Sequence, residues 1–91
     1  MKDELKVIET DGTIKYIEQS KKHAFKQLQT IIGGYIIPIA LPQGQIMVVD
    51  EDGIPKGLKI NKVASAILME LGAMMDPILG TVVICSSKHI N

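Results

Sequence analysis

The sequence predicts a single α+β domain over residues 1–91, with elements in the order ββαββαβ and two helices packed on a mostly antiparallel sheet. Three observations predict it: an Asp-Gly turn between short apolar runs, an amphipathic stretch that ends at Gly33-Gly34, and a β-branched run near the C-terminus. A chain of 91 residues has room for one thin core. That core must be aliphatic, because the chain has 15 isoleucines and only three aromatic residues.

Residues 4–18 are predicted to form a β-hairpin. Asp11-Gly12 lies between two apolar runs, and glycine accepts a positive φ angle without steric cost. Two registers fit the spacing: a two-residue turn pairs Ile8 with Lys15, and a bulged turn pairs Ile8 with Ile14. We favour the bulged turn.

A helix is predicted over residues 21–32. Ser20 is a suitable N-cap, since its hydroxyl can accept a hydrogen bond from an N–H of the first turn. The apolar residues fall on one helical face: Ala24, Phe25, Leu28, Ile31 and Ile32. Gly33-Gly34 then ends the helix.

A second hairpin is predicted over residues 35–49, with its turn at residues 42–45. Pro38 interrupts its first strand. Proline has no N–H for a β-ladder, so this strand is expected at a sheet edge, or Pro38 is expected to mark a bulge.

The C-terminal third is predicted to contain a helix over residues 61–71, a strand over 80–85 and a polar tail over 86–91. Asn61 is a suitable N-cap for the helix, and Gly72 follows its last turn. Because the run over 80–85 is short and continuously apolar, we expect this strand at the centre of the sheet.

Charge is balanced at ten lysines against ten acidic residues, and arginine is absent. Arginine supplies the bidentate fork that reads phosphates and guanine edges, so this composition argues against a specific DNA-binding domain. Cys85 is the only cysteine and therefore has no internal disulfide partner. The sequence also has no cationic and apolar leader and no apolar run of about 18 residues, so we expect a cytoplasmic protein.

No catalytic or metal-binding motif is recognised, and we expect neither an enzyme nor a cofactor. The acidic run Asp50-Glu51-Asp52 lacks the spacing of a calcium loop, and three carboxylates in one turn do not separate their pKa values for acid–base work. Cys85 with His89 could form a nucleophile and base, but an inert buried thiol fits an apolar strand better.

The segment Lys56-Gly57-Leu58-Lys59-Ile60-Asn61-Lys62 is the candidate binding site. It leads into a helix N-terminus, where free N–H groups and the helix dipole favour anions. The residues proposed to bind an anion or a partner are Lys56, Gly57, Lys59, Asn61 and Lys62. The alternative is a solvated basic turn in which Asn61 only caps the helix.

An ordered series of motifs runs from Leu28 to Ile84: Leu28, Gly33-Gly34-Tyr35-Ile36, Leu41-Pro42-x-Gly44, Val48-Val49-x-Glu51-x-Gly53, Gly57-Leu58-x-x-Asn61, Ala64 or Ala66, and Gly80-x-Val82-Val83. The series covers more than half of the chain. It resembles a family of short phage, plasmid and bacterial proteins catalogued as domain of unknown function number 3846. Thr81 departs from the pattern, which has an acidic residue near that position. The resemblance implies a small accessory protein of a mobile element and implies no activity.

We therefore expect a non-enzymatic protein that binds a host protein or a small phosphorylated molecule, as a counter-defence inhibitor or a sequestering protein. A homo-oligomer would suit this role, since a thin domain can build a pocket between protomers. The alternative is a nucleic-acid-binding regulator in which Lys15, Lys21, Lys22 and Lys26 follow phosphates. Balanced charge argues against that alternative.

Overall fold

The computed structural model describes residues 4–72 and 76–90 and confirms the predicted order of elements. Five antiparallel strands form one sheet in the order β2-β1-β5-β4-β3. The strands are β1 (Glu4–Ile8), β2 (Ile14–Glu18), β3 (Ile36–Ala40), β4 (Gln45–Asp50) and β5 (Val82–Ser86). The helices are α1 (Ala24–Ile32) and α2 (Lys62–Glu70), with 3-10 turns η1 (Pro42–Gly44) and η2 (Ser87–Ile90).

The first hairpin adopts the bulged register that the sequence favoured. Ile8 pairs with Ile14, and Val7 pairs with Lys15. The Asp11 carboxylate accepts a hydrogen bond of 2.9 Å from the Thr13 N–H, and Gly12 has a φ of 92°. The turn therefore uses glycine where the backbone is left-handed.

Helix α1 begins at Ala24, three residues later than predicted. Ser20 does accept a hydrogen bond from the His23 N–H, at 3.0 Å. However, the Gln27 side chain accepts from the Ser20 N–H at 2.8 Å and donates to the Glu18 carbonyl at 3.1 Å. These two bonds hold the connecting chain against the helix in a bend, so the first turn forms only after it.

Strand β3 lies at one edge of the sheet, which is the place that Pro38 predicted. Strand β5 is central, also as predicted, but it spans Val82–Ser86 and not residues 80–85. Gly80 is outside the strand because its φ of 84° is incompatible with extended backbone. The predicted polar tail over residues 86–91 is wrong for most of its length. Ser86 belongs to β5, and Ser87–Ile90 form η2 beside α1. Asn91 lies outside the described residues.

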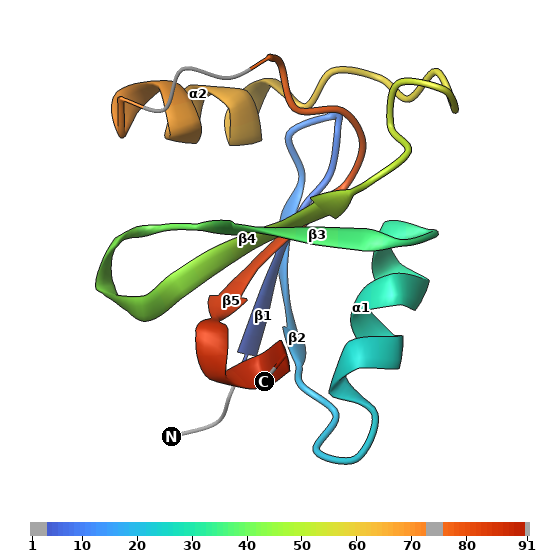
Figure 1. Cartoon of the computed structure of the whole chain (residues 1–91), viewed down its shortest axis with the longest axis vertical. Coiled ribbons are helices and arrows are strands. Elements are labelled where there is room, and N and C mark those ends of the chain that lie inside the picture. The colour runs from blue at the N-terminus through green and yellow to red at the C-terminus, as the bar shows by residue number, and fades with distance from the viewer. Residues whose placement is uncertain (1–3, 73–75, 91) are drawn as a thin grey trace.

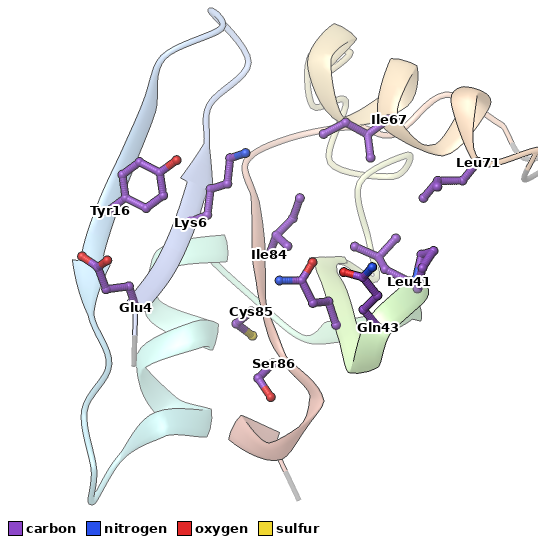
Figure 2. A pocket seen from close by; sticks show the side chains of 12 residues that line it. Glu4, Lys6, Tyr16, Leu41, Gln43, Ile67, Leu71, Ile84, Cys85 and Ser86 are labelled. Carbon is purple, nitrogen blue, oxygen red and sulfur yellow. The ribbon is translucent and has the colours of Figure 1, made fainter. Parts of the chain in front are cut away.

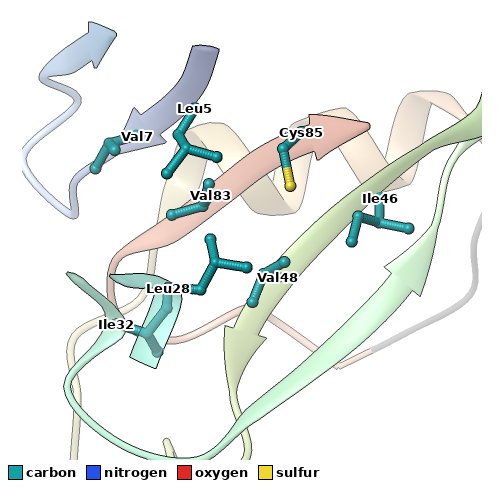
Figure 3. Packing of buried hydrophobic residues seen from close by; sticks show 8 residues of the cluster. All are labelled: Leu5, Val7, Leu28, Ile32, Ile46, Val48, Val83 and Cys85. Carbon is teal, nitrogen blue, oxygen red and sulfur yellow. The ribbon is translucent and has the colours of Figure 1, made fainter. Parts of the chain in front are cut away.

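The two helices cover opposite faces of the sheet. In Figure 1, α2 lies above the β3–β4 hairpin and α1 lies below it. Residues from β1, β4, β5 and α1 form the core on the α1 face, shown in Figure 3: Leu5, Val7, Leu28, Ile32, Ile46, Val48, Val83 and Cys85. The α2 face buries a second set: Ile8, Met47, Val49, Ala64, Leu68, Ile78, Val82 and Ile84. The continuous apolar runs in β4 and β5 follow from this, because both faces of these strands are covered.

No helix in the described part of the chain is long and apolar enough to cross a membrane.

Candidate functional site

Lys56, the first residue of the predicted anion site, acts as an internal counterion. Its ammonium lies 2.8 Å from Asp50 Oδ2 and donates to the Gly33 carbonyl at 3.1 Å. The Asp50 side chain is only 1% exposed, whereas that of Lys56 is 36% exposed. A buried carboxylate needs a paired cation, so Lys56 joins the end of β4 to the end of α1. A Cβ on Gly34 would lie against Lys56 Nζ, so a larger residue at this position would displace the lysine from the pair.

Asn61, the second key residue of that site, is fully buried and uses its whole amide within the protein. Its Nδ2 donates to the carbonyls of Ile8 at 3.0 Å and Gly80 at 2.9 Å. Its Oδ1 accepts from the Ala64 N–H at 3.0 Å, which is the predicted N-cap. Asn61 therefore ties α2 to β1 and to the segment that precedes β5.

The other three residues of the predicted site are exposed. Gly57 occupies a left-handed turn with a φ of 66°, and Lys59 and Lys62 face solvent without an ion-pair partner in the described structure. Two of the five residues thus have their polar atoms engaged internally. Anion binding at this segment stays a prediction, supported now by Lys59 and Lys62 alone.

The structure also places the residues considered for nucleophilic chemistry, metal binding and nucleic-acid binding. Cys85 is buried in the α1-side core, and burial raises the pKa of its thiol to about 11. In the described ranges, no three His, Cys, Asp or Glu side chains gather as a metal-binding group would. Of the lysines expected to follow nucleic-acid phosphates, Lys15 lies 3.6 Å from the Glu9 carboxylate, and Lys21, Lys22 and Lys26 are exposed.

A cleft of about 660 Å³ lies between α2 and the part of the sheet that α2 leaves uncovered (Figure 2). Its floor is formed by residues of β1, β4 and β5, and β5 contributes the consecutive residues Ile84, Cys85 and Ser86. The apolar lining residues are Leu41, Pro42, Ile67, Leu71 and Ile84. The polar lining side chains are Glu4, Lys6, Tyr16, Gln43, Gln45 and Ser86. We call this space the α2 cleft.

Lys6 is the cation of the α2 cleft. It lies on β1, directly between Tyr16 of β2 and Ile84 of β5 in the ladder, and it is half-buried. In Figure 2 its ammonium points toward the space beneath Ile67, whereas the carboxylate of Glu4 points toward Tyr16. No acidic side chain in the described structure pairs with Lys6. The Lys6 ammonium therefore places a positive charge in a cleft that has both polar and apolar lining residues.

A second cavity, of about 760 Å³, lies where β3, β4 and the segment before β5 meet. Its charged lining residues are all acidic: Asp50, Glu51 and Asp76. Asp50 already pairs with Lys56, and the cavity offers no cation to a ligand. Of these two cavities, only the α2 cleft has a lysine in its lining.

The sequence did contain a signal for the α2 cleft, although it was not recognised. Glu4 and Lys6 alternate with Leu5 and Val7, so β1 presents charged residues to one face and buried residues to the other. In an ordinary two-layer fold, such charges face bulk solvent. Here α2 overhangs them, and only the tertiary arrangement brings Ile67 and Leu71 above Lys6.

Comparison with known proteins gives one match. The family model described as "Domain of unknown function (DUF3846)" matches residues 1–90. No curated protein and no solved structure matches this chain. The match covers nearly the whole sequence and includes every motif from Leu28 to Ile84, so the chain belongs to the DUF3846 family.

Proposed function

We propose that this protein works by binding, and that it sequesters a small ligand with an apolar body and an anionic group in the α2 cleft. The observation that carries the proposal is Lys6, a half-buried lysine on an inner strand that points into the α2 cleft and has no carboxylate partner among the described residues. A phosphate or carboxylate of the ligand supplies the missing negative charge.

The lining of the α2 cleft supports this ligand class. Clefts that bind small molecules measure roughly 300–1,000 Å³ and combine apolar walls with a few polar groups. Ile67, Leu71 and Leu41 provide the wall, and the amides of Gln43 and Gln45 can donate hydrogen bonds to the ligand. The ligand's apolar body packs beneath α2, and its anionic group meets Lys6.

A sequestering role also agrees with the small accessory protein that the family resemblance implies. Such a protein acts stoichiometrically, so its effect depends on affinity and on abundance instead of turnover. Sequestration needs only the α2 cleft and no reactive side chain. A phosphorylated small molecule is the ligand expected from the sequence, and the charge of Lys6 favours it.

The test uses ligand pairs that differ only in the anionic group: adenosine with adenosine 5′-monophosphate, and octanol with octyl phosphate. Binding is measured by native mass spectrometry and titration calorimetry. At least one phosphorylated member should bind more tightly than its neutral partner. Lys6→Met keeps the length and apolar stem of the side chain but removes the charge, and a hydrogen bond to a charged group contributes about 1.5–3 kcal/mol. Affinity should therefore fall by about 10- to 100-fold.

Lys59→Met and Lys62→Met are the matched controls, since both lysines are exposed and neither lines the α2 cleft. They should leave the affinity within about threefold of the original, in line with weak exposed charge pairs. If Lys59→Met and Lys62→Met weaken binding and Lys6→Met does not, the ligand lies at the α2 N-terminus and the α2 cleft is the wrong site. If neither phosphorylated ligand binds better than its neutral partner, the proposed anionic selectivity is wrong.

A further inference from the structure

Gln43 has a backbone conformation that is unusual for its residue type. Its φ is 63° and its ψ is 34°. Among the non-glycine residues that the structure describes, only Gln43 has a positive φ. A left-handed backbone brings Cβ close to the following carbonyl oxygen, so mainly glycine, asparagine and aspartate adopt it. Glutamine is therefore held here in a conformation that disfavours it.

The turn that contains Gln43 does not require glutamine. Gln43 and Gly44 are its two central residues, and the Gln45 N–H closes it by donating to the Pro42 carbonyl. Both central residues have a positive φ, as in type I′ turns, where the favoured pair is Asn-Gly. No described residue forms a hydrogen bond with the Gln43 amide. The turn alone therefore gives no reason for a side chain longer than that of asparagine.

The Gln43 side chain lines the α2 cleft, as Lys6 does. Lys6 lies on β1 and Gln43 lies just before β4, and β5 separates these two strands. Figure 2 shows Lys6 and Gln43 on opposite sides of Ile84, a residue of β5. Neighbouring strands lie about 4.8 Å apart, so a ligand that contacts both side chains spans on the order of 10 Å.

We propose that Gln43 is a positioning residue of the α2 cleft, and that its amide binds a neutral polar group of the ligand whose anionic group binds Lys6. This inference rests on the proposed function of the α2 cleft. The ligand carries its two polar ends on the order of 10 Å apart, with its apolar body between them. An amide offers both donors and an acceptor, so it fits a group that offers both, such as the edge of a nucleobase.

The cleft explains the residue that the turn does not. Glutamine places its amide one methylene group farther from the backbone than asparagine does, which extends its reach into the α2 cleft. Residues in sparsely populated backbone conformations cluster at ligand-binding sites, where the position of the side chain matters more than local stability. Shortening the side chain of Gln43 should therefore move stability and binding in opposite directions.

The first measurement is the stability of Gln43→Asn, which keeps the amide, shortens its reach and suits a left-handed backbone. Urea unfolding should show a rise of about three- to tenfold in the folding equilibrium constant, because the left-handed backbone is no longer strained. Gln45→Asn is the matched control, since it makes the same chemical change where the backbone is extended, with a φ of −99° and a ψ of 162°. It should not stabilise the fold.

The second measurement is the affinity of the same protein for adenosine 5′-monophosphate and for octyl phosphate, by titration calorimetry. The nucleotide has a phosphate and a nucleobase edge, whereas octyl phosphate has no polar group at its other end. Gln43→Asn should weaken nucleotide binding by about fivefold or more and octyl phosphate binding by less than about twofold, since only the nucleotide loses hydrogen bonds. Gln43→Gly also relaxes the backbone but removes the amide, so it should weaken nucleotide binding at least as much.

Four results would overturn the role of Gln43 and leave binding at Lys6 intact. They are no gain of stability in Gln43→Asn, unchanged nucleotide affinity in that variant while Lys6→Met lowers it, equal weakening of both ligands, and binding of octyl phosphate without binding of the nucleotide. If neither ligand binds, or if Lys6→Met leaves both affinities unchanged, the proposed function itself fails and the role of Gln43 fails with it.

Discussion

Replacement of Asn61 should destabilise the fold far more than loss of a helix cap alone. Asn61→Ala leaves the carbonyls of Ile8 and Gly80 and the N–H of Ala64 without their partner, at a site that is fully buried. Each buried polar group left unsatisfied costs about 1–3 kcal/mol, so three such groups cost roughly 3–5 kcal/mol after partial relaxation. A domain of this size is stable by only about 5–14 kcal/mol, so this loss is a large fraction of the total.

The companion variant Asn61→Asp separates the helix cap from the two tertiary bonds. Aspartate keeps the oxygen that accepts from the Ala64 N–H, but it cannot donate to Ile8 or Gly80. If the cap were the main contribution, Asn61→Asp would retain most of the stability. We expect it to cost at least as much as Asn61→Ala, because it also places a carboxylate beside two carbonyl oxygens.

Urea unfolding followed by circular dichroism measures both variants, since the chain has no tryptophan to report by fluorescence. Lys62→Ala is the control: Lys62 is adjacent but exposed, and its loss should change stability by less than about 0.5 kcal/mol. The reasoning fails if Asn61→Ala costs less than about 1 kcal/mol, or if Asn61→Asp is as stable as the original protein.

Three further predictions concern the backbone, acid stability and the thiol. Gly80→Ala should lower the free energy of unfolding in urea by about 1–3 kcal/mol, which is more than Gly57→Ala should. Both glycines have a positive φ, but of the two only Gly80 would bring a Cβ against a neighbour, Leu58 Cδ1 at 2.7 Å. Equal losses in the two variants would contradict this reasoning. Hydrogen bonds from Thr13 lower the pKa of Asp11 below 3.8, so ionised Asp11 stabilises the fold above that pH and the contribution is lost as the pH falls through the lowered pKa. The stability advantage over Asp11→Asn should therefore shrink in acid-unfolding curves below pH 3.8, and a constant difference would refute the assignment. Burial raises the pKa of Cys85 to about 11, so the native thiol should react slowly with a disulfide reagent in mildly alkaline buffer and rapidly in urea, whereas equal rates would show that the thiol is accessible.

Local chemistry was sufficient to predict most of the fold. The Asp11-Gly12 turn predicted the first hairpin, because few residues adopt the backbone that such a turn needs. It left two registers open, and the favoured bulged register is the one observed. Pro38 predicted an edge strand, since a missing N–H is tolerated only where no neighbour requires it. Asn61 predicted the start of α2 within one residue. In each case the cause lies within a few residues of the effect.

The errors arose where side chains make contacts that the sequence pattern does not encode. The start of α1 depends on Gln27, which binds backbone groups of Ser20 and Glu18 from the middle of the helix. Anion binding at Lys56, Gly57, Lys59, Asn61 and Lys62 stays a prediction, but local charge and helix geometry did not reveal the internal partners of Lys56 and Asn61. Both residues instead use their polar atoms on distant partners, at Gly33 and at Ile8.

The sequence by itself determined the order and type of the elements, the central place of β5 and the edge position of β3. These follow from hydrophobic period, turn residues and hydrogen-bonding capacity, which act over short distances. Only the tertiary structure decided which face each helix covers, and that Lys6 of β1 and Ile67 of α2 line the same cleft. The α2 cleft joins residues from opposite ends of the chain. Lys6 and the apolar residues Ile67 and Leu71 line one cleft only because β5 lies between β1 and β4 in the sheet. No local sequence pattern specifies that placement.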